Sequence, residues 1–297
     1  MRLGVLPRFH ESVITDPEWV HGFGALCEEV GVESVWSVEH VLVAQDYEPR
    51  YSYSADGRMP GAPGTVMPDP LEWLAYLAAV TSTVKLGTSV VVLPLHAPVV
   101  LAKRVATLDA LSGGRVIFGV GLGWQVEEYR AVGVPYEERG ARADEAIEVL
   151  RACWAPDPVS FSGPFTEVPP ASVLPKPAQG MALPIVIGGS TRVAARRAGR
   201  LGDGFFPYVC GPEDFADRVS VIRATAQEHG RDPDAIELTA WPGSYRFGSA
   251  FDLDLAKRYA DLGATRFVVS SQEAAGATFD DLRRFLTDYQ ERILTRL

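Results

Sequence analysis

The chain has 297 residues, of which 47% are hydrophobic and 22% are charged, and its 28 basic and 38 acidic residues give a formal net charge of −10. This apolar content excludes wholesale disorder. The acidic balance argues against a nucleic-acid partner, because such binding depends on basic residues that displace counterions. The sequence holds no apolar run long enough to span a membrane, and its first apolar run is too short for a signal peptide.

Cysteine and histidine usage narrows the chemistry further. Cys27, Cys153 and Cys210 are far apart and form no Cys-x-x-Cys pair. Three cysteines are too few for a disulfide framework, so a reducing, cytoplasmic setting is expected. The sequence carries neither a metal-ligand motif nor a G-x-S-x-G nucleophile elbow, so we predict no dedicated metal site and no serine hydrolase.

Short apolar runs alternate with longer amphipathic segments along the whole chain. Asp16 supplies an N-cap before Pro17, which predicts a helix that ends near Gly31. Thr278 and Asp281 predict a capping box before the last helix. We predict strands at 3–6, 34–38, 85–93, 115–120, 184–187, 204–206, 236–241 and 266–269. Helices are expected at 17–31, 71–82, 99–111, 125–131, 139–154, 192–201, 215–229 and 252–262, and after Thr278.

Eight strand–helix units predict an α/β fold of the (β/α)8 TIM-barrel type. We expect a single domain over residues 1–297. A doubly wound sheet is the competing architecture. Two proline-rich stretches, 44–69 and 156–180, interrupt the alternation. Loops of this length usually carry function. We therefore expect long insertion loops at the C-terminal face of the barrel, with surface decoration or a subunit contact as the alternative.

The active site of such a barrel lies at the C-terminal ends of its strands. Gly188, Gly189, Ser190 and Thr191 follow the fifth predicted strand and directly precede a helix. Backbone N–H groups and the dipole at a helix N-terminus suit a phosphate group. The alternative is an ordinary glycine turn with a hydroxyl N-cap.

Three further strand ends carry candidates. His40 follows the second strand beside Glu39, where an imidazole can move a proton, although a structural histidine is the alternative. Gly121 and Gly123 belong to a G-x-G-x-G run whose spacing differs from the dinucleotide fingerprint, so it indicates close backbone approach or tight strand–helix packing. The stretch 87–90 predicts a bulge in a valine-rich strand, or simply a buried strand.

Taken together, these motifs resemble the bacterial luciferase-like monooxygenase superfamily, and most closely its actinobacterial oxidoreductases that use coenzyme F-420, a 5-deazaflavin. The resemblance covers nearly the whole chain. It is carried by Trp36-Ser37-Val38-Glu39-His40, Lys85 to Val90, Leu101 to Asp109, Ser112 to Arg115, Gly119 to Trp124, Glu127 to Tyr129, Arg139 to Leu150, Pro184 to Thr191 and Gly202 to Gly204. The stretch Tyr51 to Arg58 is typical of one subgroup.

The resemblance implies a barrel whose strand ends hold a flavin-like ring, and a homodimer. It places a non-proline cis peptide at Ser89-Val90 behind the ring and His40 near the reactive face. It also implies a coenzyme phosphate near Gly188, Gly189, Ser190 and Thr191, with Gly121 and Gly123 on the other side of the coenzyme. Better-known members have aspartate where this chain has Glu39, and some have an acid where it has Trp124. Glu127 or Glu128 is a candidate substitute for that acid.

The predicted function is hydride transfer between the deazaflavin and a small organic substrate, whose identity the sequence does not reveal. A first alternative is an FMN-dependent monooxygenase that uses reduced flavin and oxygen. A second is a barrel that binds a flavin without turnover. A non-redox hydrolase comes last, because the chain lacks a nucleophile or metal motif.

Overall fold

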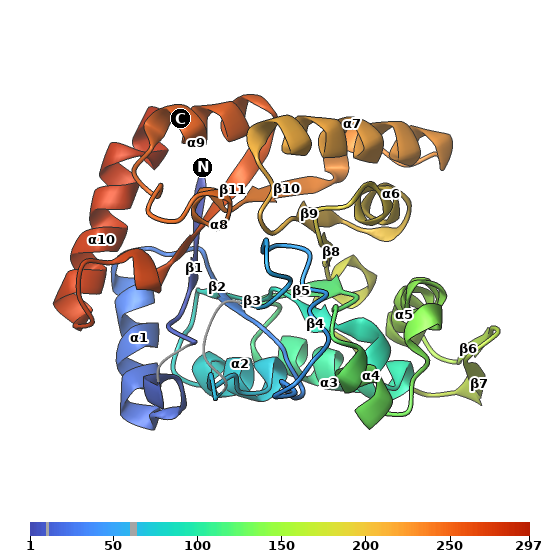
Figure 1. Cartoon of the computed structure of the whole chain (residues 1–297). Helices are drawn as coiled ribbons and strands as arrows, with labels where there is room; N and C mark the ends of the chain where they lie inside the picture. The colour runs from blue at the N-terminus through green and yellow to red at the C-terminus, as the bar shows by residue number, and fades with distance from the viewer. Residues whose placement is uncertain (10–11, 60–63) are drawn as a thin grey trace.

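The computed structural model describes residues 1–9, 12–59 and 64–297, and its centre is a closed barrel of parallel strands (Figure 1). The strand β1 pairs with β2 on one side and with β11 on the other, and the pairing of β3 with β5 closes the ring. In sequence order the barrel strands are β1 (Arg2–Leu6), β2 (Ser34–Ser37), β3 (Lys85–Thr88) with its continuation β4 (Val91–Val92), β5 (Val116–Gly121), β8 (Ile185–Gly188), β9 (Gly204–Phe206), β10 (Glu237–Ala240) and β11 (Ala264–Ser270). The predicted TIM barrel is confirmed, and the doubly wound sheet is excluded.

Helices surround the strands (Figure 1). They are α1 (Pro17–Glu29), α2 (Pro70–Ala78), α3 (Pro98–Leu111), α4 (Val126–Ala131), α5 (Arg139–Trp154), α6 (Arg192–Leu201), α7 (Pro212–Glu228), α8 (Pro242–Tyr245), α9 (Leu253–Asp261) and α10 (Phe279–Arg292). The side chain of Asp16 accepts a hydrogen bond from the Glu18 N–H at the start of α1, and Thr278 and Asp281 form the predicted capping box at α10. Local capping chemistry therefore fixed both of these helix starts.

The structure corrects two sequence-based expectations. The third barrel strand was expected to be continuous from 85 to 93, but it breaks between β3 and β4, where the Ser89–Val90 peptide is cis, as the family resemblance implied. The stretch 156–180 was expected as a loop, but it contains an antiparallel hairpin of β6 (Val159–Ser162) and β7 (Glu167–Ala171) beside α5 (Figure 1). Val159 and Val168 are buried, and this apolar pairing explains why the segment folds.

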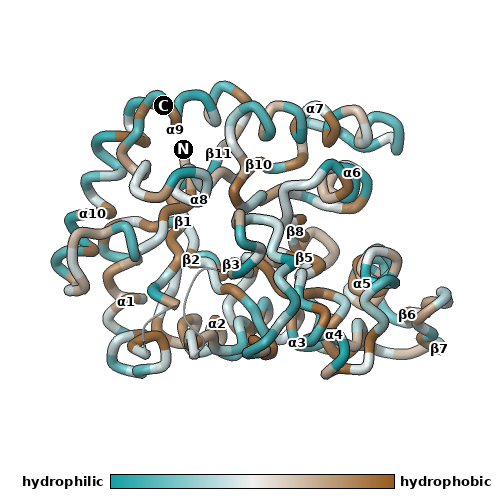
Figure 2. The backbone as a smooth tube through the Cα atoms, viewed as in Figure 1, coloured by the Kyte–Doolittle hydropathy of each residue, from teal (hydrophilic) through white to brown (hydrophobic). Residues whose placement is uncertain are grey.

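Large and small side chains interlock in the middle of the barrel. Trp36 on β2 is fully buried and contacts the ring of Phe206 edge to face, with 5.0 Å between the centroids. A Cβ at Gly87 on the neighbouring strand would lie 2.5 Å from the Trp36 ring, so only glycine leaves room for the indole there. The interior of the barrel is therefore packed rather than open. Apolar residues follow the central strands, whereas many residues of α7 and α10 are polar (Figure 2).

A buried ion-pair network closes the N-terminal end of the barrel. Arg266 is 1% exposed, and it donates to both carboxylate oxygens of Glu33 at 2.8 Å and to Glu237. Arg2 donates to the other oxygen of Glu237 at 2.6 Å, and Lys85 lies 3.2 Å from Glu33. Burial by itself raises the pKa of Glu33, but the hydrogen bonds and charge of Arg266 outweigh it and lower that pKa to about 2.

The described part of the chain contains no helix that is long and apolar enough to cross a bilayer. Within the same residues, no group of three histidine, cysteine or acidic side chains is placed to hold a metal ion. Cys27, Cys153 and Cys210 are buried and free.

Candidate active site

His40 lies just beyond β2 and is held by a buried carboxylate. Its Nδ1 lies 3.2 Å from Oε2 of Glu128 on α4, whose side chain is fully buried, whereas the imidazole is 13% exposed. The other oxygen of Glu128 accepts the Val41 N–H at 2.8 Å. Since a carboxylate only accepts hydrogen bonds, Nδ1 of His40 is the donor, and Nε2 is left to exchange a proton.

Glu39 faces the opposite way from its neighbour. Its carboxylate lies 2.9 Å from Nε2 of His96 and accepts the Val92 N–H at 2.6 Å. Val92 belongs to β4, directly after the break in the third strand. Glu39 and His96 therefore fasten β4 to the end of β2, and two histidine–glutamate pairs stand side by side at this face.

The glycines after β5 and β8 make room for the valine that follows the strand break. A Cβ at Gly188 would lie 2.5 Å from Cγ1 of Val90, and a Cβ at Gly121 would collide with Cγ2 of the same residue. Gly123 faces Val92 in the same way, and its φ is +63°. The close approach expected at Gly121 and Gly123 is therefore present. The atoms that approach these glycines are the side chains of Val90 and Val92 in the β3–β4 segment.

The start of α6 presents backbone N–H groups at the same end of the barrel. Thr191 is the N-cap and its hydroxyl accepts the Ala194 N–H at 3.1 Å, while Ser190 N–H donates to the Tyr53 hydroxyl at 3.4 Å. Arg218 of α7 donates to the Ser190 carbonyl at 2.7 Å. Arg192 is paired with Asp217, so its charge is largely compensated. The sequence left an N-cap and a phosphate-binding site as alternatives at this position. The Thr191 cap satisfies one N–H group of the first helical turn, and the other N–H groups of that turn are left for an anion.

The described part of the loop 44–69 lies against the strand ends; its residues 60–63 fall outside the described residues. Tyr47 and Tyr51 are buried and both contact Trp124, with centroid distances of 4.9 and 5.2 Å. Tyr53 contacts Tyr208, which follows β9, at 5.0 Å. The loop therefore lies over the C-terminal end of the barrel, where an insertion loop was predicted.

Several buried polar atoms at this end have no hydrogen-bond partner within the described residues. They include the hydroxyls of Ser37, Ser89 and Ser271 and the indole nitrogen of Trp124, which follow or end four different barrel strands. Buried polar groups are normally paired. A flavin-like ring carries carbonyl and N–H groups around an apolar plane, and its phosphate suits the start of α6, so the residues present fit such a coenzyme.

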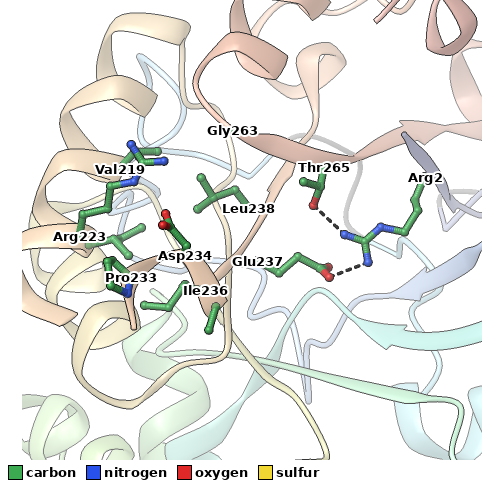
Figure 3. Close-up of a pocket in the computed structure, with 12 residues that line it drawn as sticks. Arg2, Val219, Arg223, Pro233, Asp234, Ile236, Glu237, Leu238, Gly263 and Thr265 are labelled. Carbon is green, nitrogen blue, oxygen red and sulfur yellow. Dashed lines mark hydrogen bonds and ion pairs between the residues drawn. The ribbon is translucent and has the colours of Figure 1, made fainter. Parts of the chain in front are cut away.

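A separate pocket of about 340 Å³ opens at the opposite end of the barrel (Figure 3). It lies between α7 and the starts of β10 and β11, and Arg2, Glu237 and Thr265 line one side of it. The guanidinium of Arg2 is already bonded to Glu237 and to Thr265. Because barrel enzymes use the C-terminal face, we do not assign the active site to this pocket.

The site also contains residues that the sequence did not single out. Tyr208 and Arg218 lie at the C-terminal face, and Trp241 directly follows β10. His96, by contrast, was a strand-end candidate after the third predicted strand, and the structure pairs it with Glu39. The rule that barrel sites form at strand ends could have found Tyr208 and Trp241, but it was not applied to those strands, and Arg218 lies within α7 and carries no local signal. Glu128 was a candidate only through the resemblance, and packing alone buries it.

Comparison with known proteins agrees with the barrel geometry. The sequence profile of the luciferase-like monooxygenase family matches residues 5–245. An F420-dependent glucose-6-phosphate dehydrogenase from Kineococcus radiotolerans is 36% identical over 226 residues, which is 73% of this chain and 60% of that protein.

Two solved structures share the fold. The monooxygenase RslO1 from Streptomyces bottropensis is 22% identical, with a TM-score of 0.74 over 99% of both chains. The coenzyme F420-dependent tetrahydromethanopterin reductase from Methanopyrus kandleri is 18% identical, with a TM-score of 0.74 over 99% of this chain and 98% of the other. Because the family profile matches most of the chain and the structure is a barrel of the same kind, the chain belongs to the luciferase-like monooxygenase family and is an oxidoreductase.

Proposed function

We propose that this oxidoreductase transfers hydride between coenzyme F-420 and a small organic substrate. The observation that carries the proposal is the pairing of His40 with the buried Glu128 at the same barrel face as the N-terminus of α6. When bound, the deazaflavin accepts or donates the hydride, while the protein supplies binding, orientation and proton transfer. The relatives named for this coenzyme support the choice.

In this proposal the start of α6 holds the phosphate of the coenzyme. Gly189 would leave space for it, since the nearest atom to its Cβ is 3.4 Å away, and the backbone N–H groups after Thr191 would bind it, with the charge of Arg218 nearby. Ser89, Val90, Gly121 and Gly123 would hold the ring of the coenzyme. The unpartnered Ser89 hydroxyl and Trp124 indole nitrogen are the polar atoms available to that ring.

His40 moves the proton that accompanies the hydride. Glu128 accepts the hydrogen bond from Nδ1, which fixes the tautomer and stabilises the charged imidazolium. Nε2 of His40 then takes a proton from a substrate hydroxyl, or returns one. Glu39 acts as a positioning residue, because its oxygens hold His96 and the backbone of Val92.

The first experiment identifies the coenzyme. Purified protein is titrated with coenzyme F-420 and, separately, with FMN, and binding is followed by the fluorescence of each coenzyme. We expect the deazaflavin to bind at least tenfold more tightly. Tight FMN binding with no deazaflavin binding would contradict the proposal.

A pair of neighbouring substitutions tests the role of Glu128. Glu128→Gln should lower kcat about 10- to 100-fold, the usual loss when the partner that orients a catalytic group is removed. Glu127→Gln is the matched control, because Glu127 accepts the Glu48 N–H at 3.3 Å and, within the described residues, forms no hydrogen bond with His40. Equal values of kcat for the two variants would count against the pairing.

A monooxygenase using reduced FMN and oxygen is the second candidate, favoured by the description of the family itself. It uses the same phosphate cradle and the same ring position. Oxygen consumption that requires reduced FMN and is coupled to product formation would establish it. The absence of oxygen uptake, with turnover of the deazaflavin, would rule it out.

We further propose that the chain forms one domain over residues 1–297, assembles as a homodimer and works in the cytoplasm without nucleic acid. The closed barrel and the acidic charge support this, as does the family resemblance. Light scattering coupled to gel filtration measures the mass directly. A mass equal to one chain would contradict the dimer.

A further inference from the structure

Six aromatic rings form a continuous arc across the C-terminal end of the barrel. In order they are Tyr47, Trp124, Tyr51, Tyr53, Tyr208 and Trp241, and we call them the aromatic arc. Successive centroids lie 4.9, 5.2, 5.3, 5.0 and 5.5 Å apart. The ring of His40 lies 5.9 Å from that of Trp124, so the arc begins beside the histidine to which we assign proton transfer.

The arc is uncharged and only partly covered. Tyr47 and Tyr51 are buried, whereas Trp124, Tyr53, Tyr208 and Trp241 keep part of their surface exposed. Burial, and then the neighbouring Tyr208, raise the pKa of Tyr51 far above its usual range, so this hydroxyl stays protonated. The exposed parts of these rings therefore offer a neutral, largely apolar wall.

The ionised side chains held at the His40 end of the arc are carboxylates. Those of Glu39 and Glu128 are buried there. Arg218 lies farther along, at the Ser190 carbonyl beside Tyr53, where we place the coenzyme phosphate. Arg58, whose guanidinium lies 5.5 Å from the Tyr47 ring centroid, is exposed at the rim, and it is the only cation stacked on the arc within the described residues. An anionic substrate placed between the arc and His40 would lose hydration and meet carboxylates instead of a cation.

From the arc and these charges we infer that the site takes an uncharged, apolar carbonyl compound or the corresponding alcohol, and excludes phosphorylated sugars. This inference rests on the proposed function. For acetophenone the step balances as follows: the carbonyl carbon gains the hydride that the reduced coenzyme loses, and the oxygen gains a proton from the His40 imidazolium, which gives 1-phenylethanol. The arc provides aromatic contacts to the ring of such a substrate.

Two phenyl ketones, one neutral and one anionic, test the inference. Acetophenone and phenylglyoxylate share the phenyl ring and the ketone, but phenylglyoxylate carries a carboxylate. Each is titrated into coenzyme-loaded protein by calorimetry, with glucose 6-phosphate as a third ligand. We expect acetophenone to bind at least tenfold more tightly than phenylglyoxylate, and glucose 6-phosphate to give no heat over the same range.

Substitutions within the arc and outside it complete the test. Trp124→Leu and Trp241→Leu, at different positions along the arc, should each weaken acetophenone binding about tenfold. The control is Tyr76→Leu, because Tyr76 is an exposed aromatic residue on α2 away from the arc. Circular dichroism and the coenzyme titration are repeated for each variant, so that unfolding or coenzyme loss is separated from substrate loss.

The outcomes separate the two proposals. Failure of the wild-type protein to bind the deazaflavin overturns the proposed function. If the coenzyme binds, the inference is overturned by equal or tighter binding of either anion, by no binding of acetophenone, or by unchanged acetophenone affinity in both tryptophan variants.

Discussion

The two ends of this barrel treat buried polar groups in opposite ways. At the N-terminal end Arg266 is buried with both carboxylates it needs, Glu33 and Glu237, so the charges are neutralised within the chain. At the C-terminal end the hydroxyl of Ser89 and the indole nitrogen of Trp124 are buried without a partner among the described residues. The first arrangement stabilises the fold, whereas the second leaves bonding capacity for a ligand.

The comparison separates stability from function in space. Substitutions at the N-terminal end should change the free energy of unfolding and leave turnover intact. Substitutions of the unpartnered or site polar groups at the C-terminal end should change turnover more than the free energy of unfolding. The four predictions below test this separation, from the largest expected effect to the smallest.

Replacing His40 should have the largest effect. His40→Ala should lower kcat about 10²- to 10⁴-fold, the range expected when a positioned acid–base group is lost. Unfolding in urea should show a smaller loss of stability than for Arg266→Met, because the Val41 N–H still donates to the Glu128 carboxylate when the imidazole is removed. A large loss of stability with an unchanged kcat would show that His40 stabilises the fold and does not take part in turnover.

Removing the cation at the other end should destabilise the fold. Arg266→Met removes the buried cation shared by Glu33 and Glu237, which then keep only the partly exposed Lys85 and Arg2, and breaking a buried pair costs about 3–5 kcal/mol. Urea unfolding measures this cost, and kcat of the remaining folded protein should match the wild type. Arg284→Met is the control, because Arg284 forms an exposed pair with Asp281 whose loss should change stability by less than about 1 kcal/mol.

The same network predicts how stability depends on acid. The pKa of Glu33 is lowered to about 2 in the folded protein, below the value of about 4.3 expected when unfolded. Its contribution, about 3 kcal/mol, is therefore complete above the unfolded pKa and is lost as the pH falls from about 4.3 to about 2. Urea unfolding across this range should show a smaller loss for Glu33→Gln than for the wild type. Parallel pH profiles would contradict this assignment.

Filling a glycine position behind the proposed ring should have the smallest effect. Gly188→Ala places a methyl group 2.5 Å from Cγ1 of Val90, which should cost about 1–3 kcal/mol by overpacking. Adding Val90→Ala should recover part of that loss. Gly140→Ala is the control, because the nearest atom to its Cβ is 3.7 Å away. No recovery in the double variant would show that Val90 is not the obstacle.

Local chemistry explains how much of the fold was predictable. Asp16, Pro17 and the Thr278–Asp281 pair act on neighbouring backbone groups, so they fixed helix starts without help from the rest of the chain. The hairpin β6–β7 was missed because its apolar residues are few and its proline content suggested a loop. The residues 87–90 indicated a bulge in the third strand, but the cis peptide at Ser89–Val90 entered only through the family resemblance.

The candidate site was predictable only in part. The sequence placed His40 and Gly188 to Thr191 at strand ends, because strand order and the barrel rule are both readable from local patterns. It did not reveal the partners of His40 and Glu39, namely Glu128 and His96. Those contacts join residues that lie 88 and 57 positions apart, and no local pattern encodes such a distance.

By itself the sequence determined a parallel α/β barrel, the positions of most of its elements and the face on which chemistry would occur. These follow from periodicity, capping and strand-end position, which act over a few residues. Only the tertiary structure decided which carboxylate serves His40, which glycines face Val90, and how six aromatic rings meet across the barrel. Each of these depends on side chains from separate strand–helix units, which come together only when the ring of strands closes.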